Sequence, residues 1–184
     1  MVIHETNKNL LSGGGYISPW WTKEDLDLPY IHEPFNNPDD LAKWQALGYT
    51  QTRFTGDLYD MRFPEPSWIN GFRKHFQWDH WSWSVYRMPP GTVLPNHSDT
   101  YARFKKIHNL PEDTTVKRAV VFLEDWQSGH YFEINGRPMQ QLNSRRPEPC
   151  MWFAGTWVVW SNDTPHLAAN VGMTDRYTLQ ITGI

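Results

Sequence analysis

The 184-residue chain lacks several features that mark particular classes of protein. It contains one cysteine, Cys150, so no internal disulfide is possible, which fits a reducing compartment such as the cytoplasm. The formal net charge is −3 and no long run of like charges occurs, so nothing favours nucleic-acid or membrane-surface binding. No apolar window is long enough to span a bilayer, and the polar N-terminus has no apolar signal core. We therefore expect neither a membrane span nor secretion.

Tryptophan, by contrast, is abundant. The chain has 11 tryptophans within an aromatic content of 15%. A core of this size needs only a few, so two interpretations remain open. Most of the tryptophans either fill a Trp-rich core or line a cleft of the kind that binds small molecules or peptides.

The length predicts one domain, residues 1–184, with an N-terminal extension over 1–80 packed on a β-rich core over 81–184. The extension is expected to be helical or irregular. A helix is predicted over 38–48, where a proline and two acids suit the first turn and a glycine ends it. A second is predicted over 66–76, where aromatic residues recur every four positions.

The residue pattern changes after residue 80. Short runs rich in β-branched and aromatic residues alternate with turn clusters, and no helix is predicted among them. The predicted strands lie within 81–88, 91–104, 118–126, 130–134, 151–160, 166–171 and 176–184. Many short strands at this spacing indicate a sandwich, a barrel or a jelly roll. We predict a mainly β jelly roll with a short helical or irregular N-terminal region.

One His-x-Asp triplet, formed by His97 and Asp99, lies in an extended-looking run. Alternate side chains of a strand share a face, so these two can share an ion if a distant strand supplies a third ligand. His166, which opens another predicted strand, is the candidate. Two histidines and one carboxylate form the facial set of non-haem Fe(II) oxygenases, with open positions for other ligands. The alternative is a surface-loop histidine beside a capping aspartate, with His166 in the core.

Arg176 and Thr178 lie two residues apart in the last predicted strand, so they share a face as well. A guanidinium binds a carboxylate through two parallel hydrogen bonds, and a neighbouring hydroxyl adds a third. Together they could hold a carboxylate. The alternative is an arginine that simply faces solvent.

The order of His97-x-Asp99, His166 and Arg176-x-Thr178 resembles the Fe(II)/2-oxoglutarate-dependent dioxygenase superfamily. The resemblance covers the β-rich C-terminal part and implies the double-stranded β-helix, a cupin-like jelly roll. It implies that His97, Asp99 and His166 bind Fe(II). It also implies that Arg176 and Thr178 hold the distal carboxylate of 2-oxoglutarate, the cosubstrate used with O2.

Other contacts follow less directly from the resemblance. Tyr86 lies on the predicted strand before the His-x-Asp triplet, and Arg118 begins the predicted strand after it. Both are candidates to bind 2-oxoglutarate. Tyr101 and Arg103 continue the strand phase of the triplet and are expected to line the cleft. For each of these four, packing or surface exposure is an open alternative. Many members of the superfamily have aspartate where this chain has Thr156.

The resemblance implies an oxygenase that hydroxylates an unactivated C–H bond and releases succinate and CO2. In the family the N-terminal extension and loops recognise the substrate, and here these segments contain Trp20, Trp21, Trp78, Trp81 and Trp83. Aromatic walls suit a peptide or amino-acid-like substrate, and they also suit an apolar small molecule. The small catalytic domain resembles prolyl and Asp/Asn-type hydroxylases, which favours a peptidyl hydroxylase.

Several alternatives remain. The chain could be a small-molecule 2-oxoglutarate oxygenase, or a cupin enzyme that uses no 2-oxo acid and so has no need of Arg176 paired with Thr178. It could also be a metal-free jelly-roll module that binds carbohydrate or another ligand. The sequence does not indicate an oligomeric state.

Overall fold

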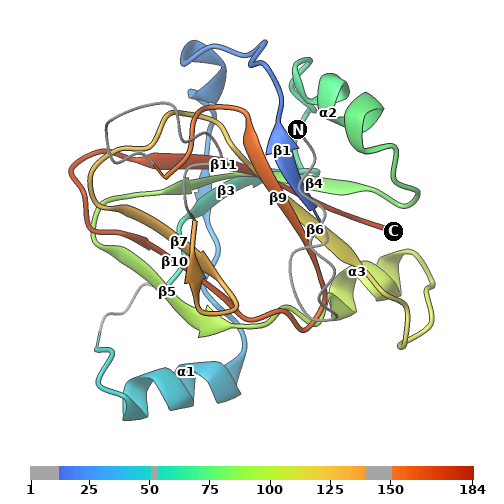
Figure 1. The fold of residues 1–184 in the computed structure, drawn as a ribbon. Coiled ribbons are helices and arrows are strands. Elements are labelled where there is room, and N and C mark those ends of the chain that lie inside the picture. The colour runs from blue at the N-terminus through green and yellow to red at the C-terminus, as the bar shows by residue number, and fades with distance from the viewer. Residues whose placement is uncertain (1–12, 51–53, 140–150) are drawn as a thin grey trace.

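The computed structural model describes residues 13–50, 54–139 and 151–184, and Cys150 lies outside these ranges. The described strands form two antiparallel sheets that face each other (Figure 1). The larger sheet has the order β1 (Gly13–Tyr16), β9 (Thr156–Ser161), β6 (Lys117–Phe122), β11 (Arg176–Gly183), β4 (Ser82–Met88), β3 (Asp57–Asp60) and β2 (Ile31–His32). The smaller sheet has the order β5 (Thr92–His97), β10 (His166–Asn170), β7 (His130–Ile134) and β8 (Arg137–Pro138).

From β4 onward the chain crosses repeatedly between the two sheets. Strands β4, β6, β9 and β11 belong to the larger sheet, whereas β5, β7, β8 and β10 belong to the smaller one. This alternation winds the chain into a jelly roll. The predicted strands after residue 80 are therefore confirmed, with adjusted ends, and so is the mainly β fold class.

The main core fills the space between the sheets. Both sheets contribute large buried side chains to it, among them Tyr86, Phe122, Phe132, Trp152 and Trp160. Alternation along each strand sends the neighbouring residues to the outer face of the larger sheet. There a second apolar cluster packs against the N-terminal region.

The N-terminal region contains both predicted helices, and three strands that the sequence did not predict. Helix α1 spans Pro38–Ala46, and the Asn37 side chain caps it by accepting from two backbone N–H groups. Helix α2 spans Ile69–Phe76 and covers the outer face of the larger sheet together with the short 3-10 helix η1 (Glu24–Leu26). Strands β1, β2 and β3 extend the larger sheet at both edges. They have only two to four residues each, too few for a period-two pattern to emerge.

A third helix, α3 (Ala102–Ile107), corrects the expectation that no helix follows residue 80. Tyr101 precedes it with a left-handed backbone, φ 54°, which turns the chain out of the extended run. Phe104 then packs into a small cluster with Tyr101 and Val116. In the described part of the chain, no helix is both long and apolar enough to cross a membrane.

Candidate metal centre and inner pocket

The two candidate histidines lie side by side on neighbouring strands. His97 is the last residue of β5 and His166 is the first of β10, and the two are cross-strand partners. Their ring centroids are 4.3 Å apart, and both residues are buried. The antiparallel register of β5 and β10 therefore brings together two residues that are far apart in the sequence.

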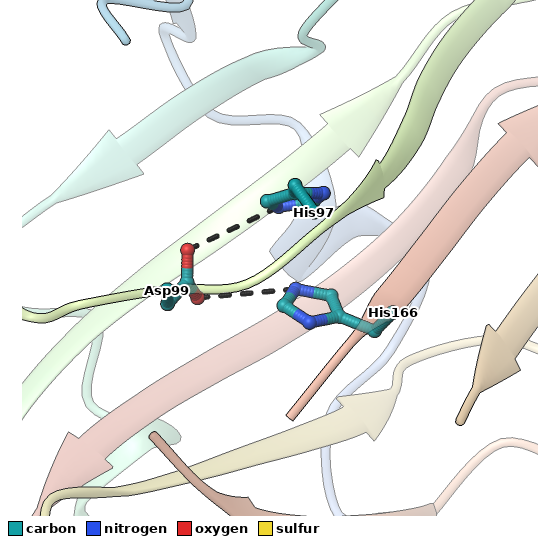
Figure 2. A group of neighbouring side chains, drawn as sticks. All are labelled: His97, Asp99 and His166. Atoms are coloured by element: carbon teal, nitrogen blue, oxygen red, sulfur yellow. Dashed lines mark ion pairs between the residues drawn. The ribbon is translucent and has the colours of Figure 1, made fainter. Parts of the chain in front are cut away.

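Asp99 completes the group from a loop and not from a strand. Strand β5 ends at His97, so the predicted strand alternation does not place the carboxylate, although the three side chains do meet. Asp99 Oδ1 is 3.9 Å from His97 Nε2, and Asp99 Oδ2 is 3.9 Å from His166 Nε2. Figure 2 shows one carboxylate oxygen facing each ring. Ligand atoms of all three residues lie within 4.8 Å of one another.

Backbone carbonyls set the orientation of both imidazoles. His97 Nδ1 is 2.8 Å from the carbonyl oxygen of Pro95, and His166 Nδ1 is 3.0 Å from that of Thr164. A carbonyl can only accept, so Nδ1 carries the hydrogen in each ring and Nε2 presents a lone pair. Both lone pairs are on the nitrogens that face Asp99. This donor set of two nitrogens and one carboxylate fits a divalent metal such as Fe(II).

The electrostatics favour the protonation states that a metal needs. Burial opposes ionisation of Asp99, but the charges of Arg118, His166 and His97 hold its pKa below the usual value. Burial, with repulsion from His97, lowers the pKa of His166 to about 4. At neutral pH the carboxylate is therefore charged and His166 is neutral, as metal ligation requires.

An inner pocket runs from this group between the two sheets. Asp99 and His166 line one part of it, and Arg176 and Thr178 on β11 line another. The remaining lining comes mostly from apolar and aromatic side chains of both sheets: Tyr86, Leu94, Val120, Phe132, Trp160 and Ala168. The predicted shared face of Arg176 and Thr178 is confirmed, since both point into this pocket.

Arg176 is a buried cation with few partners. It is 2% exposed, and its Nη1 donates to the backbone oxygen of Tyr131 at 2.6 Å. Its Nε has no hydrogen-bond partner, and no carboxylate lies within 4 Å of its guanidinium among the described residues. Burial lowers the pKa of Arg176 to about 10, against the opposing influence of Tyr86 and Glu124. A buried charge without an anion is costly, so the position suits an anionic ligand.

Arg118 lies beside the candidate metal ligands and not beside Arg176. Its Nη2 is 3.4 Å from Asp99 Oδ2, and its Nη1 donates to Gln180 Oε1 at 2.7 Å. The guanidinium also stacks on the ring of Tyr101, 5.1 Å from the ring centroid. The predicted contact with 2-oxoglutarate remains a prediction, but the structure shows a direct partner for Arg118 that the sequence did not suggest.

An outer cleft of about 760 Å³ opens beside the histidine–aspartate group. Tyr101 and Arg103 line it, as expected, although they sit at the start of α3 and not on a strand. The outer cleft and the inner pocket share Asp99, Arg118 and Gln180. The candidate metal centre therefore lies where the two cavities meet.

The expectation of a tryptophan-lined mouth is wrong for most of the residues named. All five are described, and of these Trp83 alone borders the outer cleft. Trp21, Trp81 and Trp83 are buried in the cluster on the outer face of the larger sheet, and Trp78 packs against it. Trp83 reaches that face because the odd-numbered residues of β4 point away from the smaller sheet.

Aromatic residues of the N-terminal region reach the candidate centre elsewhere. Trp44 of α1 and Phe35 just before it pack edge-on against the His97 ring, with centroids 6.1 and 5.8 Å away. Trp44 belongs to the helix that the sequence predicts over 38–48. Its contact with His97 could not be predicted, because no local pattern links α1 to β5.

No family model and no curated protein matches this sequence. Solved structures with a similar fold include a prolyl-4-hydroxylase from Pseudomonas putida, with 17% identity over 87% of this chain and 95% of that one, TM-score 0.49. An oxidoreductase of the 2OG-Fe(II) oxygenase family from Burkholderia pseudomallei has 16% identity over 80% of each chain, TM-score 0.40. A cupin protein from Bacteroides fragilis has 13% identity over 60% of this chain and 71% of that one, TM-score 0.36. The jelly roll itself is defined by the strand order of the two sheets, and the roles of individual residues have to be argued from the site itself.

Proposed function

We propose that this protein is an Fe(II)- and 2-oxoglutarate-dependent oxygenase that hydroxylates an unactivated C–H bond. One observation carries the proposal. Two buried histidines and one half-buried carboxylate lie together, and Asp99 and His166 of this group share a pocket with a buried arginine that has no carboxylate within 4 Å in the described part of the chain. A metal chelated by a dicarboxylic 2-oxo acid would satisfy both features at once.

The residues have separate tasks in this proposal. His97, Asp99 and His166 would hold Fe(II), while Arg176 and Thr178 would bind the distal carboxylate of 2-oxoglutarate. When bound, the iron and 2-oxoglutarate supply the oxidation, in which one atom of O2 enters the C–H bond, the other enters succinate, and CO2 leaves. The protein binds and orients these partners.

The walls of the inner pocket support the same chemistry. The apolar side chains of Leu94, Val120, Phe132 and Ala168 limit the water that could enter between the two sheets. A dry surrounding strengthens the attraction between a guanidinium and a carboxylate, since the effective dielectric is low. Tyr86 and Arg118 line the same pocket, and both are proposed as further contacts of the cosubstrate.

We further propose that the substrate is a peptide. The outer cleft is open, and its volume of about 760 Å³ leaves room for a peptide segment. A cupin enzyme that uses no 2-oxo acid would leave the buried charge of Arg176 without a role. The structure therefore favours the 2-oxoglutarate enzyme over that alternative.

The decisive experiment is an anaerobic titration of the purified protein with Fe(II) and then 2-oxoglutarate. A visible metal-to-ligand charge-transfer band should appear with 2-oxoglutarate and not with succinate, because succinate has no keto oxygen to chelate the metal. A protein that binds Fe(II) tightly but forms no band would be an iron protein of another kind. A protein that binds neither would contradict the proposal.

A further inference from the structure

The inner face of the larger sheet changes character beside the candidate metal centre. Between the sheets this face is apolar, as at Phe122. Towards the outer cleft it carries four polar side chains in two adjacent cross-strand pairs, in which Ser84 faces Gln180 and Ser82 faces Thr182. We term these four residues the polar floor. A block of polar side chains on an inward face, where apolar packing is the rule, indicates a surface that binds something.

The polar floor has unused hydrogen-bonding capacity. All four residues line the same cleft as His97. Among the described residues, the hydroxyls of Ser82, Ser84 and Thr182 make no hydrogen bond to another protein group. Gln180 accepts from Arg118 through Oε1, which leaves its amide nitrogen as a donor. The floor can therefore both donate to a ligand and accept from it.

Each arginine that lines the cleft has a carboxylate within 4 Å. Arg62 Nη2 lies 3.0 Å from Glu33 Oε2, and Arg103 Nη1 lies 3.9 Å from Glu33 Oε1. Arg118 lies 3.4 Å from Asp99. The lining thus holds three arginines, Arg62, Arg103 and Arg118, against three aspartates, Asp40, Asp60 and Asp99, so little net charge remains to attract an ion. A ligand with polar but uncharged groups fits this lining best.

The spacing of the floor matches an extended backbone. Ser82 and Ser84 are alternate residues of β4, so their side chains repeat at about 6.6–6.8 Å along the strand. Amide groups on one side of an extended peptide repeat at the same distance, because that peptide has strand geometry itself. On the rim of the cleft, Met61 and Ile107 are 53% and 63% exposed and offer apolar contacts for side chains.

We propose that the polar floor binds the backbone amides of an uncharged, extended peptide segment, which is the substrate if the proposed function is correct. Ser84 and Thr182 would hydrogen-bond the peptide amides, and Gln180 would add a donor. Met61 and Ile107 would contact the side chains that point away from the floor. The inference extends the proposed function by naming the residues that select the substrate.

The probe is a pool of short peptides, acetylated and amidated at their ends, that contain no charged side chain. Two matched pools carry one glutamate or one lysine, and a fourth pool contains linear alcohols of similar size. Affinity is measured for the metal-free protein and for the anaerobic protein loaded with Fe(II) and 2-oxoglutarate. The variants are Ser84→Ala, Thr182→Val and the double variant. Ser128→Ala, an exposed serine outside the cleft, serves as the control.

We expect the uncharged peptides to bind best, and each single variant to bind them roughly 2- to 10-fold more weakly, as loss of one hydrogen bond predicts. The double variant should lose both factors, and Ser128→Ala should bind as wild type does. Tighter binding of a charged or alcohol pool overturns the inference, as does absence of peptide binding or wild-type affinity in the double variant. The metal titration is read separately, so failure of Fe(II) or 2-oxoglutarate binding would remove the proposed function, while binding to the metal-free protein still decides the role of the floor.

Discussion

Arg118 and His166 share one carboxylate oxygen of Asp99. The Nη2 atom of Arg118 is 3.4 Å from Asp99 Oδ2, and His166 Nε2 is 3.9 Å from the same oxygen. Oδ1 is left to face His97. The guanidinium therefore fixes the rotation of a carboxylate that comes from a loop and that no strand holds in place.

Substitution of Arg118 should weaken metal binding without removing a ligand. Substitution of a residue that contacts a metal ligand typically lowers metal affinity about 10- to 100-fold, so we expect a loss in that range for Arg118→Met. Arg118→Lys should recover part of the loss because it keeps the charge. Loss of Arg118 should also raise the pKa of Asp99, because the charge of Arg118 is the largest influence that lowers this pKa. As the pH is lowered, the variant should therefore lose its metal at a higher pH than wild type does.

The measurement is equilibrium metal binding across a pH series. Arg87→Met is the matched control, because Arg87 also pairs with an aspartate, Asp57 at 2.9 Å, but on the outer face of the sheet. Equal affinity in wild type and Arg118→Met would show that Asp99 is held without the arginine.

Each of His97→Ala, Asp99→Ala and His166→Ala should lose Fe(II) binding and the charge-transfer band. A facial site has three protein ligands, so the loss should exceed the roughly 100-fold upper limit of outer-sphere changes. Iron content and circular dichroism would be compared with those of His75→Ala, which removes an exposed histidine on α2. Two variants with normal iron content would show that these residues are not the ligands.

Arg176→Ala should impair 2-oxoglutarate binding and leave Fe(II) binding unchanged. Truncation of one side of a buried charged pair costs about 2–5 kcal/mol, or roughly 30-fold to several thousand-fold in affinity. Arg176→Lys should recover part of this, and Thr178→Val should cost about 1.5–3 kcal/mol. Titration of 2-oxoglutarate into each anaerobic iron-loaded variant tests this. Wild-type affinity in Arg176→Ala would direct attention to Arg118 as the cation that holds the cosubstrate.

Glu124 should make stability fall as the pH rises. Burial raises its pKa to about 7 from an ordinary 4.5, against a backbone hydrogen bond from Tyr177 and the charge of Arg176. The folded state therefore binds the proton more tightly than the unfolded state. The resulting stability is present in full below the unfolded value of 4.5 and is lost as the pH rises through 7.

The isosteric change Glu124→Gln should remove this dependence. The variant should be more stable than wild type at about pH 8, by up to roughly 3 kcal/mol, and gain nothing at about pH 4. Urea unfolding at several pH values measures the difference, with Glu112→Gln at an exposed site as the control. A constant difference at all pH values would mean that packing, not protonation, separates the two proteins.

Trp83→Ala should destabilise the fold and not change substrate choice. Trp83 is 3% exposed in the outer-face cluster, and its indole N–H donates to Glu65 Oε2 at 2.8 Å. Truncation of a buried tryptophan costs about 3–5 kcal/mol. Trp20→Ala, at a residue that is 43% exposed, should cost less. Full stability with altered peptide binding would restore the assignment of Trp83 to the cleft.

The strands after residue 80 and the shared face of Arg176 and Thr178 could be predicted because both follow from period-two patterns. The alternation that gives Arg176 and Thr178 one face also gives that face to Gln180 and Thr182, so half of the polar floor was visible in the last strand. The other half, Ser82 and Ser84, alternates in the same way on β4. What was missing was the register between these strands, which decides that the two halves are neighbours.

The errors have a different physical origin. Asp99 was expected on a strand, but the chain leaves the extended conformation after His97 and turns into α3. Trp81 and Trp83 were placed at the mouth because they precede the jelly roll in sequence. Sequence proximity does not say which face of a sheet a residue occupies, and an N-terminal layer that packs on the outer face needs aromatic residues there.

Strand β5 forms one edge of the smaller sheet and is hydrogen-bonded to β10 alone within that sheet. Its last residue, His97, lies opposite the first residue of β10, His166. An ion held by both side chains would cross-link the edge strand β5 to β10. The cross-link would lie at the end of the strand pair, where strands separate first. The two histidines would thus hold the ion and also tie the edge strand to its neighbour, so that cofactor loading and the stability of this edge would change together.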